Sequence, residues 1–372
     1  MRFFLFWVVL GLCQNTSFAV EVVKVGLAFK FGPTINNSAD PVYQGILFAK
    51  EQFEKKNKFI KIELVKYSFT PEQSTREKVA QQVIADHVKF VVGGLLSEEA
   101  MALGDQFKGH DILFITPTSS NPRVTSADKP NVFRVCFSDD QVAEALAKYV
   151  LSQTQMKSIG VLHNTSDAYT DYLTTEFLKQ YDHLKDNQNQ VKFSEFRYAG
   201  EKPKFSSAVE KFKRDQVDTV VAFTLQDDLE GFFAAAQKAQ FHPLYFGSDG
   251  WSANETLEKM KGFKAIRNAY WYQESKAPAV KNFVKEYEKA NHVKPDSVNA
   301  IAYDSMMVLL DSVLKAKNKQ SVSEVAGILK ASHFHDLVTS EHFEFNEHHS
   351  PNKTLYLYQV DNNGSKFLKG IE

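Results

Sequence analysis

The sequence predicts an α/β protein of two lobes, each built on a mainly parallel β-sheet, and three observations lead to this. The chain has 372 residues, whereas a single hydrophobic core usually stops growing at about 250–300 residues. Short apolar stretches alternate with helical stretches of about 10–15 residues, which is the pattern of βαβ units. This alternation runs from residue 22 to residue 115 and restarts after residue 138.

The composition is that of an ordinary folded protein. Hydrophobic residues make up 43% of the chain and charged residues 24%, so disorder is not indicated. The formal net charge is -1, from 44 basic and 45 acidic residues, and no run of basic residues stands out. Nucleic acid and anionic membrane surfaces are therefore not expected as partners.

Residues 1–19 have the pattern of a signal peptide. Arg2 precedes an apolar stretch at residues 3–12, which has about half the length that a membrane-spanning helix needs. Small residues at Ser17 and Ala19 predict cleavage after Ala19 and export to the periplasm. No later apolar run approaches about 18 residues, so the mature chain is expected to be soluble.

The two cysteines raise separate questions. Cys13 allows an alternative in which the chain is a lipoprotein, although Leu12 is not the small residue that normally precedes a lipidated cysteine. After cleavage Cys136 is the only cysteine left, so an internal disulfide is impossible. A buried thiol in the core is expected there.

The first half of the chain predicts four strands and three helices. Strands are expected at residues 22–28, 60–67, 89–92 and 112–115, and helices at 43–53, 73–86 and 97–107.

The second half opens with Ser138–Gln141, which fits a capping box before an apolar helical stripe. Strands are expected at residues 158–162, 191–198, 219–223, 244–246 and 265–272, and helices at 169–180, 205–214 and 229–238. Helices at 278–290, 297–315 and 322–331 follow, and a last hairpin includes a strand at 354–360. Because no Pro/Gly/Ser linker separates the halves, short crossing strands are expected to join them.

Four turns at the carboxyl ends of predicted strands carry polar groups, and ligands of open parallel sheets bind at such ends. Ser97 follows two glycines and opens a helix, whose free N–H groups suit a carboxylate. Residues 117–122 place Thr118, Ser119 and Ser120 between two prolines. Ordinary structural roles, an N-cap and a surface turn, remain open for these two segments.

The other two turns belong to the second half. Tyr169 opens a helix after the strand at 158–162 and offers an apolar ring with a polar tip. Asp249 lies between two glycines, where a carboxylate would suit an ammonium group. Packing within the lobe for Tyr169, and a turn-forming Asp-Gly for Asp249, are the alternatives.

Signatures of catalysis are missing from the sequence. There is no GxSxG, GxxxxGK[ST] or HExxH, and no GxGxxG follows a predicted strand. We therefore predict neither an enzyme nor a bound cofactor.

Five of the eleven histidines come late in the chain: His333, His335, His342, His348 and His349. His333 and His335 could present two metal ligands on one strand face. A solvated polar region is the favoured alternative, because no thiolate or well-spaced carboxylate completes a set of ligands. No metal ligand is predicted.

Taken together, the segments from residue 22 onwards resemble the periplasmic leucine/isoleucine/valine-binding proteins, the type I solute-binding components of branched-chain amino-acid ABC transporters. The resemblance rests on KFVVGGLLS, ITPTSSNPRVT, NVFRVCFSDDQVAEALAKYV, DTVVAFTLQDD, YFGSDGW and SVNAIAYDSMMVL, in this order. It implies two Rossmann-like lobes joined by three hinge crossovers, near residues 138–140, 273–277 and 336–340. The first lobe would comprise residues 20–138 and 277–337, and the second residues 139–276 and 338–372.

The resemblance also implies roles for seven residues. Ser97 matches the serine that binds the ligand's α-carboxylate, and Thr118, Ser119 and Ser120 match a loop that holds both carboxylate and ammonium. Tyr169 matches a second-lobe tyrosine. Asp249 matches the acid that pairs with the ammonium group, where leucine binders typically have Glu. Leu225 falls where leucine binders have a Tyr, so a different side-chain pocket is expected, and the disulfide of some members is absent because its position matches Leu96.

The function implied is capture of a small amino acid-like ligand between the lobes and its delivery to an inner-membrane ABC permease by a monomer. Three alternatives stay open. The first is a binding protein for amides, urea or aromatic carboxylates. The second is a soluble sensor subunit. The third is a secreted metal-dependent or hydrolytic enzyme that uses the late histidines.

Overall fold

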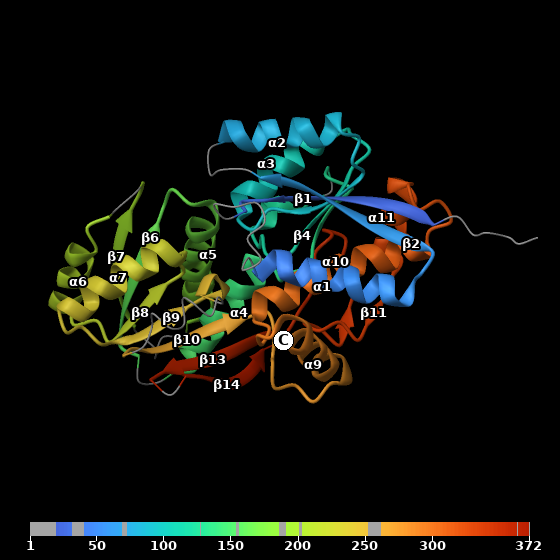
Figure 1. Ribbon diagram of the computed structural model, residues 1–372. Coiled ribbons are helices and arrows are strands. Elements are labelled where there is room, and N and C mark those ends of the chain that lie inside the picture. Colours follow the sequence, from blue (N-terminus) through green and yellow to red (C-terminus); the bar gives the residue numbers. More distant parts are fainter. Residues whose placement is uncertain are drawn as a thin grey trace, which may run out of the picture.

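The computed structural model shows two α/β lobes lying side by side (Figure 1). It describes residues 20–31, 41–68, 73–126, 128–153, 156–185, 191–200, 203–251, 262–362 and 364–371. The predicted signal peptide and Cys13 lie outside the described residues. The fold class predicted from the sequence is confirmed.

The first lobe is built on an all-parallel sheet of five strands in the order β2-β1-β3-β4-β5. The strands are β1 (Glu21–Phe29), β2 (Ile60–Ser68), β3 (Phe90–Gly93), β4 (Leu113–Thr116) and β5 (Val132–Arg134). The helices of this half are α1 (Pro41–Lys56), α2 (Gln73–Ala85) and α3 (Ser97–Phe107). The central strands β3 and β4 are buried along their whole length, as expected for a parallel sheet covered on both faces.

The second lobe is built on seven strands in the order β14-β13-β10-β9-β8-β6-β7. They are β6 (Ser158–Asn164), β7 (Lys192–Tyr198), β8 (Thr219–Ala222), β9 (Leu244–Gly247), β10 (Lys264–Ala269), β13 (Leu355–Asp361) and β14 (Gly364–Ile371). Strands β13 and β14 form the predicted last hairpin, which runs antiparallel at the sheet edge. The helices are α4 (Asp139–Leu151), α5 (Ala168–Leu184), α6 (Phe205–Arg214) and α7 (Gln226–Lys238).

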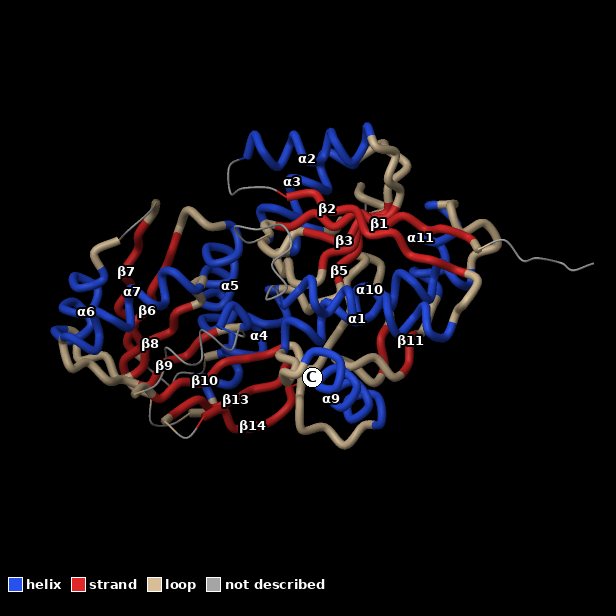
Figure 2. The backbone as a smooth tube through the Cα atoms, in the orientation of Figure 1, coloured by secondary structure: helices blue, strands red, loops and turns tan. Residues whose placement is uncertain are grey.

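The late helices return to the first lobe, as Figure 2 shows. They are α9 (Pro278–Asn291), α10 (Ser297–Lys315) and α11 (Val322–Ala331). Helix α10 packs along α1, and α9 buries Phe283 and Tyr287 against Phe48 of α1. By length and composition α10 could cross a membrane, but 72% of its apolar window is buried inside the protein, as in the core helix of a soluble lobe.

A short antiparallel hairpin of β11 (Phe334–His335) and β12 (His342–Phe343) follows α11. The chain then stays beside the first sheet, because the backbone N–H of Arg134 donates to the carbonyl of His349 at 3.0 Å. The His349 ring also stacks on Phe133, with ring centroids 4.7 Å apart. The third crossing to the second sheet therefore comes after residue 350, and not at residues 336–340 as the sequence suggested. The other lobe limits stay a prediction.

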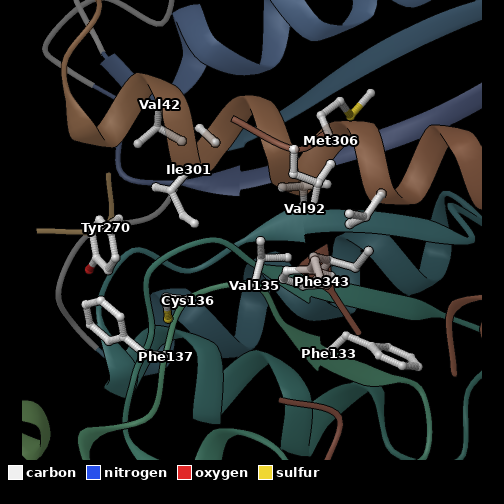
Figure 3. Packing of buried hydrophobic residues seen from close by; sticks show 14 of the residues in the cluster. Val42, Val92, Phe133, Val135, Cys136, Phe137, Tyr270, Ile301, Met306 and Phe343 are labelled. Carbon is white, nitrogen blue, oxygen red and sulfur yellow. The ribbon is translucent and has the colours of Figure 1, made fainter. Parts of the chain in front are cut away.

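The hydrophobic core is continuous from one lobe to the other through the crossovers. Figure 3 shows Cys136 and Phe137, in the segment between β5 and α4, next to Tyr270, which follows β10. The rings of Phe137 and Tyr270 stack with centroids 4.9 Å apart. Cys136 is fully buried, as predicted, and burial raises the pKa of its thiol. The segment that links β5 to α4 thus packs against the segment that follows β10, where the two lobes join.

The predicted capping box at the start of α4 is half correct. The Ser138 side chain accepts the N–H of Gln141 at 3.3 Å, as an N-cap residue should. The Gln141 side chain, however, donates to the carbonyl of Lys353 at 2.5 Å and does not return to the cap. Gln141 therefore ties the first crossover to the third.

Two helical glycines give a matched test of the packing between α1 and α10. A Cβ on Gly45 of α1 would lie 2.4 Å from the carbonyl oxygen of Asn299, whereas a Cβ on Gly327 of α11 would meet nothing within 4 Å. We expect Gly45→Ala to lower the free energy of unfolding by about 1–3 kcal/mol through overpacking. Gly327→Ala should raise it by about 0.5–1 kcal/mol through helix propensity. Urea unfolding of both variants checks this, and equal effects would contradict the close approach.

Candidate ligand-binding site between the lobes

A cavity of about 300 Å³ lies between the lobes, at the carboxyl ends of strands from both sheets. This position is the one at which open parallel sheets bind ligands. Its volume suits a small molecule. The lining residues are Leu95, Leu96, Ser97, Thr118, Tyr169, Leu225, Asp249, Gly250, Tyr270 and Val298. Five of the seven predicted site residues are therefore brought together.

Ser97 is the first residue of α3, which begins directly behind the β3 turn. Its hydroxyl oxygen accepts the backbone N–H of Asn121 at 3.2 Å. The Glu99 carboxylate accepts the N–H groups of Leu95 and Leu96, at 3.0 and 3.2 Å. The N–H groups of Ser97 and Glu98 have no acceptor within the helix, because they belong to its first turn. This end of the cavity suits an anion.

The acidic residues of this first turn are already engaged. Glu98 pairs with Arg76 at 3.1 Å. Burial raises the pKa of Glu99, and the two N–H groups that it accepts oppose that shift. Neither carboxylate is therefore an isolated negative charge at the anion end of the cavity.

The hydroxyl-rich loop divides into one lining residue and two supporting ones. Thr118 lines the cavity and donates to the carbonyl of Leu95 at 2.8 Å. The Ser119 hydroxyl lies 3.0 Å from the carbonyl oxygens of both Gly94 and Leu96. Ser119 and Ser120 are each 1% exposed, and neither is among the lining residues. In this arrangement Ser119 braces the loop against the β3 turn, so contact with a ligand through Ser119 and Ser120 stays a prediction.

Arg134 holds the same loop from behind and was missed by the sequence analysis. Its guanidinium is buried and donates through Nη1 to the carbonyls of Ser120 and Asn121, both at 2.8 Å. Its Nε donates to the Ser350 hydroxyl at 2.9 Å. Burial lowers the pKa of this arginine. The missed signal was the strand itself, because β5 has only three residues and no strand was predicted there.

Asp249 is the only charged residue among those described as lining the cavity, and it is 6% exposed. Tyr270 donates its hydroxyl to Oδ2 at 2.5 Å. Asn268 and Tyr169 donate to Oδ1 at 3.3 and 3.4 Å. Burial raises the pKa of the carboxyl group, and these donors partly oppose the shift. The site thus holds a carboxylate whose charge has been taken out of water.

Tyr169 is placed by two contacts. Its hydroxyl lies 2.5 Å from the Ser248 hydroxyl as well as near Asp249, and the residue is 5% exposed. Tyr270 was not predicted, because the sequence extended its strand to residue 272, whereas β10 ends at Ala269. With the correct strand end, the search for polar groups just after strands would have found it.

The remaining walls are apolar. Leu225 precedes α7 as its N-cap residue and faces the cavity with Leu95, Leu96 and Val298. Gly250 lies beside Tyr169, and a Cβ on it would come within 3.6 Å of that ring. A side chain at position 250 would therefore narrow the cavity.

The lobes also touch directly beside the cavity. The Asn121 side chain donates to the carbonyl of Ala168 at 2.8 Å, and the N–H of Ala168 lies 3.4 Å from the Glu98 carboxylate. Residues 121 and 98 belong to the first lobe, whereas Ala168 opens α5 of the second. The structure is therefore one in which the two lobes meet around the cavity.

Comparison with known proteins agrees with this architecture. A family model described as periplasmic binding protein matches residues 22–365. The chain belongs to this family. Among curated relatives, a leucine-, isoleucine-, valine-, threonine- and alanine-binding protein of Pseudomonas aeruginosa is 25% identical over 325 residues, which are 86% of this chain and 84% of the relative. The Leu/Ile/Val-binding protein of Escherichia coli K12 is 26% identical over 247 residues, 66% of each chain.

Two solved structures of binding proteins share the fold. A leucine-binding protein from Thermotoga maritima superposes with a TM-score of 0.82 at 21% identity, covering 94% of this chain and 99% of that one. A solute-binding protein from R. palustris in complex with benzoate gives a TM-score of 0.79 at 19% identity, covering 94% and 96%. The predicted family is confirmed.

The burial of the Asp249 carboxylate predicts that the free energy of unfolding of the ligand-free protein depends on pH. Because the pKa of this carboxyl group is raised in the folded state, the folded chain holds its proton more tightly than the unfolded chain. Stability is therefore lost as pH rises through the window between the unfolded and folded pKa values. At pH 7 ligand-free Asp249→Asn should be more stable than the wild type, by roughly 1 kcal/mol, and this advantage should shrink towards pH 4.

Thermal melting of both proteins across this pH range measures the difference. Asp182→Asn is the matched control, because the Asp182 side chain is 72% exposed and lies near the opposite end of α5 from Tyr169. An Asp249→Asn variant that loses stability equally at every pH would contradict the burial argument.

Proposed function

We propose that this chain captures a free amino acid between its lobes and delivers it to an inner-membrane ABC permease. The observation that carries the proposal is the buried carboxylate of Asp249, which lines the same cavity as Ser97 in the first turn of α3. The second lobe thus contributes a negative charge to the cavity, and the first lobe contributes the N–H groups of a helix start. A zwitterion with an ammonium and a carboxylate on one carbon has a partner for each.

The proposed contacts follow from these donors and acceptors. The ligand ammonium binds Asp249, in company with the Tyr169 and Tyr270 hydroxyls. The ligand carboxylate binds the N–H groups at the start of α3 and the Ser97 hydroxyl. Thr118 joins them when its hydroxyl proton turns from the Leu95 carbonyl to the ligand. A charge pair at 4 Å gains about 1 kcal/mol in water and about 4 kcal/mol at the effective dielectric constant of a protein surface. Exclusion of water by the closed lobes therefore gives these contacts their strength.

The ligand side chain meets an apolar wall. Leu95 and Leu96 come from the first lobe, Leu225 from the second, and Val298 from the start of α10. Among the described lining residues there is no second charged group that would recognise a charged side chain. We therefore propose an aliphatic or other apolar amino acid, in line with the names of the Pseudomonas and E. coli relatives.

Closure of the lobes couples binding to delivery in this proposal. The first lobe holds Ser97 and Thr118, whereas the second brings Tyr169 and Asp249, so only the closed form contacts both ends of the ligand. A ligand favours closure by its higher affinity for that form. The closed form is the one that the permease would recognise. We infer that the chain acts in the periplasm as a monomer without catalysis, after removal of residues 1–19.

An aromatic carboxylate is the second candidate, because the R. palustris neighbour was solved with benzoate. A ligand of that kind brings a negative charge without an ammonium group. Asp249 would then stay unpaired inside a closed cavity, which costs free energy unless the group is protonated. The buried carboxylate therefore favours the amino acid.

A thermal-shift screen of refolded, ligand-stripped protein tests the proposal. The panel is the twenty amino acids with urea, short amides and benzoates. A ligand at 100 times its dissociation constant should add about 2.7 kcal/mol of stability. We expect one or a few apolar amino acids to raise the melting temperature. A response only to amides or aromatic acids would sink the proposal.

Two variants locate the binding to the cavity. Asp249→Ala should lose most of the affinity for the stabilising amino acid, by at least about tenfold, because the buried ammonium partner is gone. Asp182→Ala, at an exposed position on α5, should keep wild-type affinity in isothermal titration calorimetry. If the affinity of Asp249→Ala is within a few-fold of the wild type, the Asp249 carboxylate does not bind the ligand's ammonium group.

A further inference from the structure

The β11–β12 hairpin separates its side chains into an apolar and a polar face. Phe334 and Phe343 are opposite each other in the pairing and are 3% and 2% exposed. Because successive residues of a strand point to opposite faces, the neighbours of these phenylalanines point outward. The neighbours are His333, His335, His342 and Glu344, and all four are exposed. Three imidazoles and a carboxylate therefore share one face.

The four side chains form two pairs across this face. The Nδ1 atoms of His335 and His342 are 3.4 Å apart. The Nδ1 atom of His333 is 2.7 Å from a Glu344 carboxylate oxygen. All four residues line one surface hollow of about 290 Å³.

We propose that this face binds one divalent transition-metal ion of the zinc, copper or nickel group, with His335 and His342 as its first two ligands. Zinc binds imidazole nitrogen at about 2.0–2.1 Å in a tetrahedron, so two such nitrogens are about 3.3 Å apart. The separation in this structure is 3.4 Å. When both rings carry their proton on Nε2, two lone pairs face each other, and a cation between them replaces that repulsion with two bonds.

The third ligand comes from the neighbouring pair. Within the part of the chain that the structure describes, no three metal-ligating side chains already converge on one point. The side chains of His333 and Glu344 are 71% and 66% exposed, so either turns towards the metal without disturbing the core. Water completes the tetrahedron, as at other zinc sites with three protein ligands. A site rich in imidazole favours zinc, copper or nickel over magnesium or calcium.

The turn of the hairpin is fixed before any metal arrives. In the turn between the strands, the N–H groups of Val338 and Thr339 donate to the buried carboxylate of Asp304, at 2.9 and 2.7 Å. The two strands therefore hold His335 and His342 in register, and little ordering is needed on binding. None of these residues lines the cavity between the lobes. Metal binding and amino-acid binding can thus fail or succeed independently.

Isothermal titration of zinc chloride into the metal-free full chain tests the site. We expect one equivalent to bind, and His335→Ala or His342→Ala to weaken it by at least about tenfold. His348→Ala is the matched control, because His348 is also an exposed late histidine, 67% exposed, but lies beyond the hairpin. It should leave the affinity unchanged. The absence of zinc binding to the wild type would overturn the proposal.

Further variants identify the third ligand and guard against unspecific binding. The zinc affinities of His333→Ala and Glu344→Gln should differ, because only the variant that removes the third ligand binds more weakly. In a separate measurement, Co²⁺ bound to the wild type should give the intense visible absorption of a tetrahedral site. These side chains are exposed, so unchanged thermal melting in the absence of metal confirms that the variants fold. Wild-type zinc affinity in a His335→Ala, His342→Ala double variant would overturn the site, even if the protein binds zinc elsewhere.

Discussion

A single buried carboxylate connects the site with the junction of the lobes. Asp249 accepts hydrogen bonds from Tyr169 at the start of α5, from Asn268 at the end of β10 and from Tyr270 just after that strand. Tyr270 in turn stacks on Phe137 of the first crossover. The hydrogen bonds to this buried charge therefore come from two segments of the second lobe, the start of α5 and residues 268–270 at the junction. A ligand that neutralises this charge acts on the part of the molecule where the lobes join.

The first lobe contributes a loop at residues 118–121 that is held firmly by hydrogen bonds. Arg134 fixes the carbonyls of Ser120 and Asn121, and Ser119 ties the same loop to the β3 turn. Hydrogen bonds to a charged donor are worth about 1.5–3 kcal/mol each, so this loop is held without help from a ligand. The first-lobe half of the site is preorganised, so in the closure proposed above it is the second lobe that moves. The contact between Asn121 and Ala168 shows where the two lobes meet.

The sequence predicted the features that local pattern determines. Alternating strands and helices gave the parallel sheets, and the turns after strands gave Ser97, Thr118, Tyr169 and Asp249, which do line one cavity. Features that depend on contacts far apart in the chain were missed. Strand β5 has three residues and exists through its pairing with β4. Arg134 is therefore recognisable as a loop anchor only once that pairing is known.

The same limit explains the errors. The third crossover lies after residue 350 because His349 packs on Phe133, more than two hundred residues earlier in the chain. Sequence pattern alone also does not show that Ser119 and Ser120 are buried and absent from the cavity lining, so their contact with a ligand stays a prediction. The late histidines lacked a carboxylate in the sequence analysis, because Glu344 joins His333 only through the β11–β12 hairpin.

The central claim is that Asp249 recognises an ammonium group. The most direct measurement is a pair of calorimetric titrations of ligand-stripped protein, one with the amino acid that stabilises it best and one with the same acid lacking its amino group. The two ligands share carboxylate and side chain, so the difference isolates the ammonium contact. The account predicts that the deaminated acid binds at least about a hundredfold more weakly, because it leaves a buried charge unpaired. Equal affinities would contradict it.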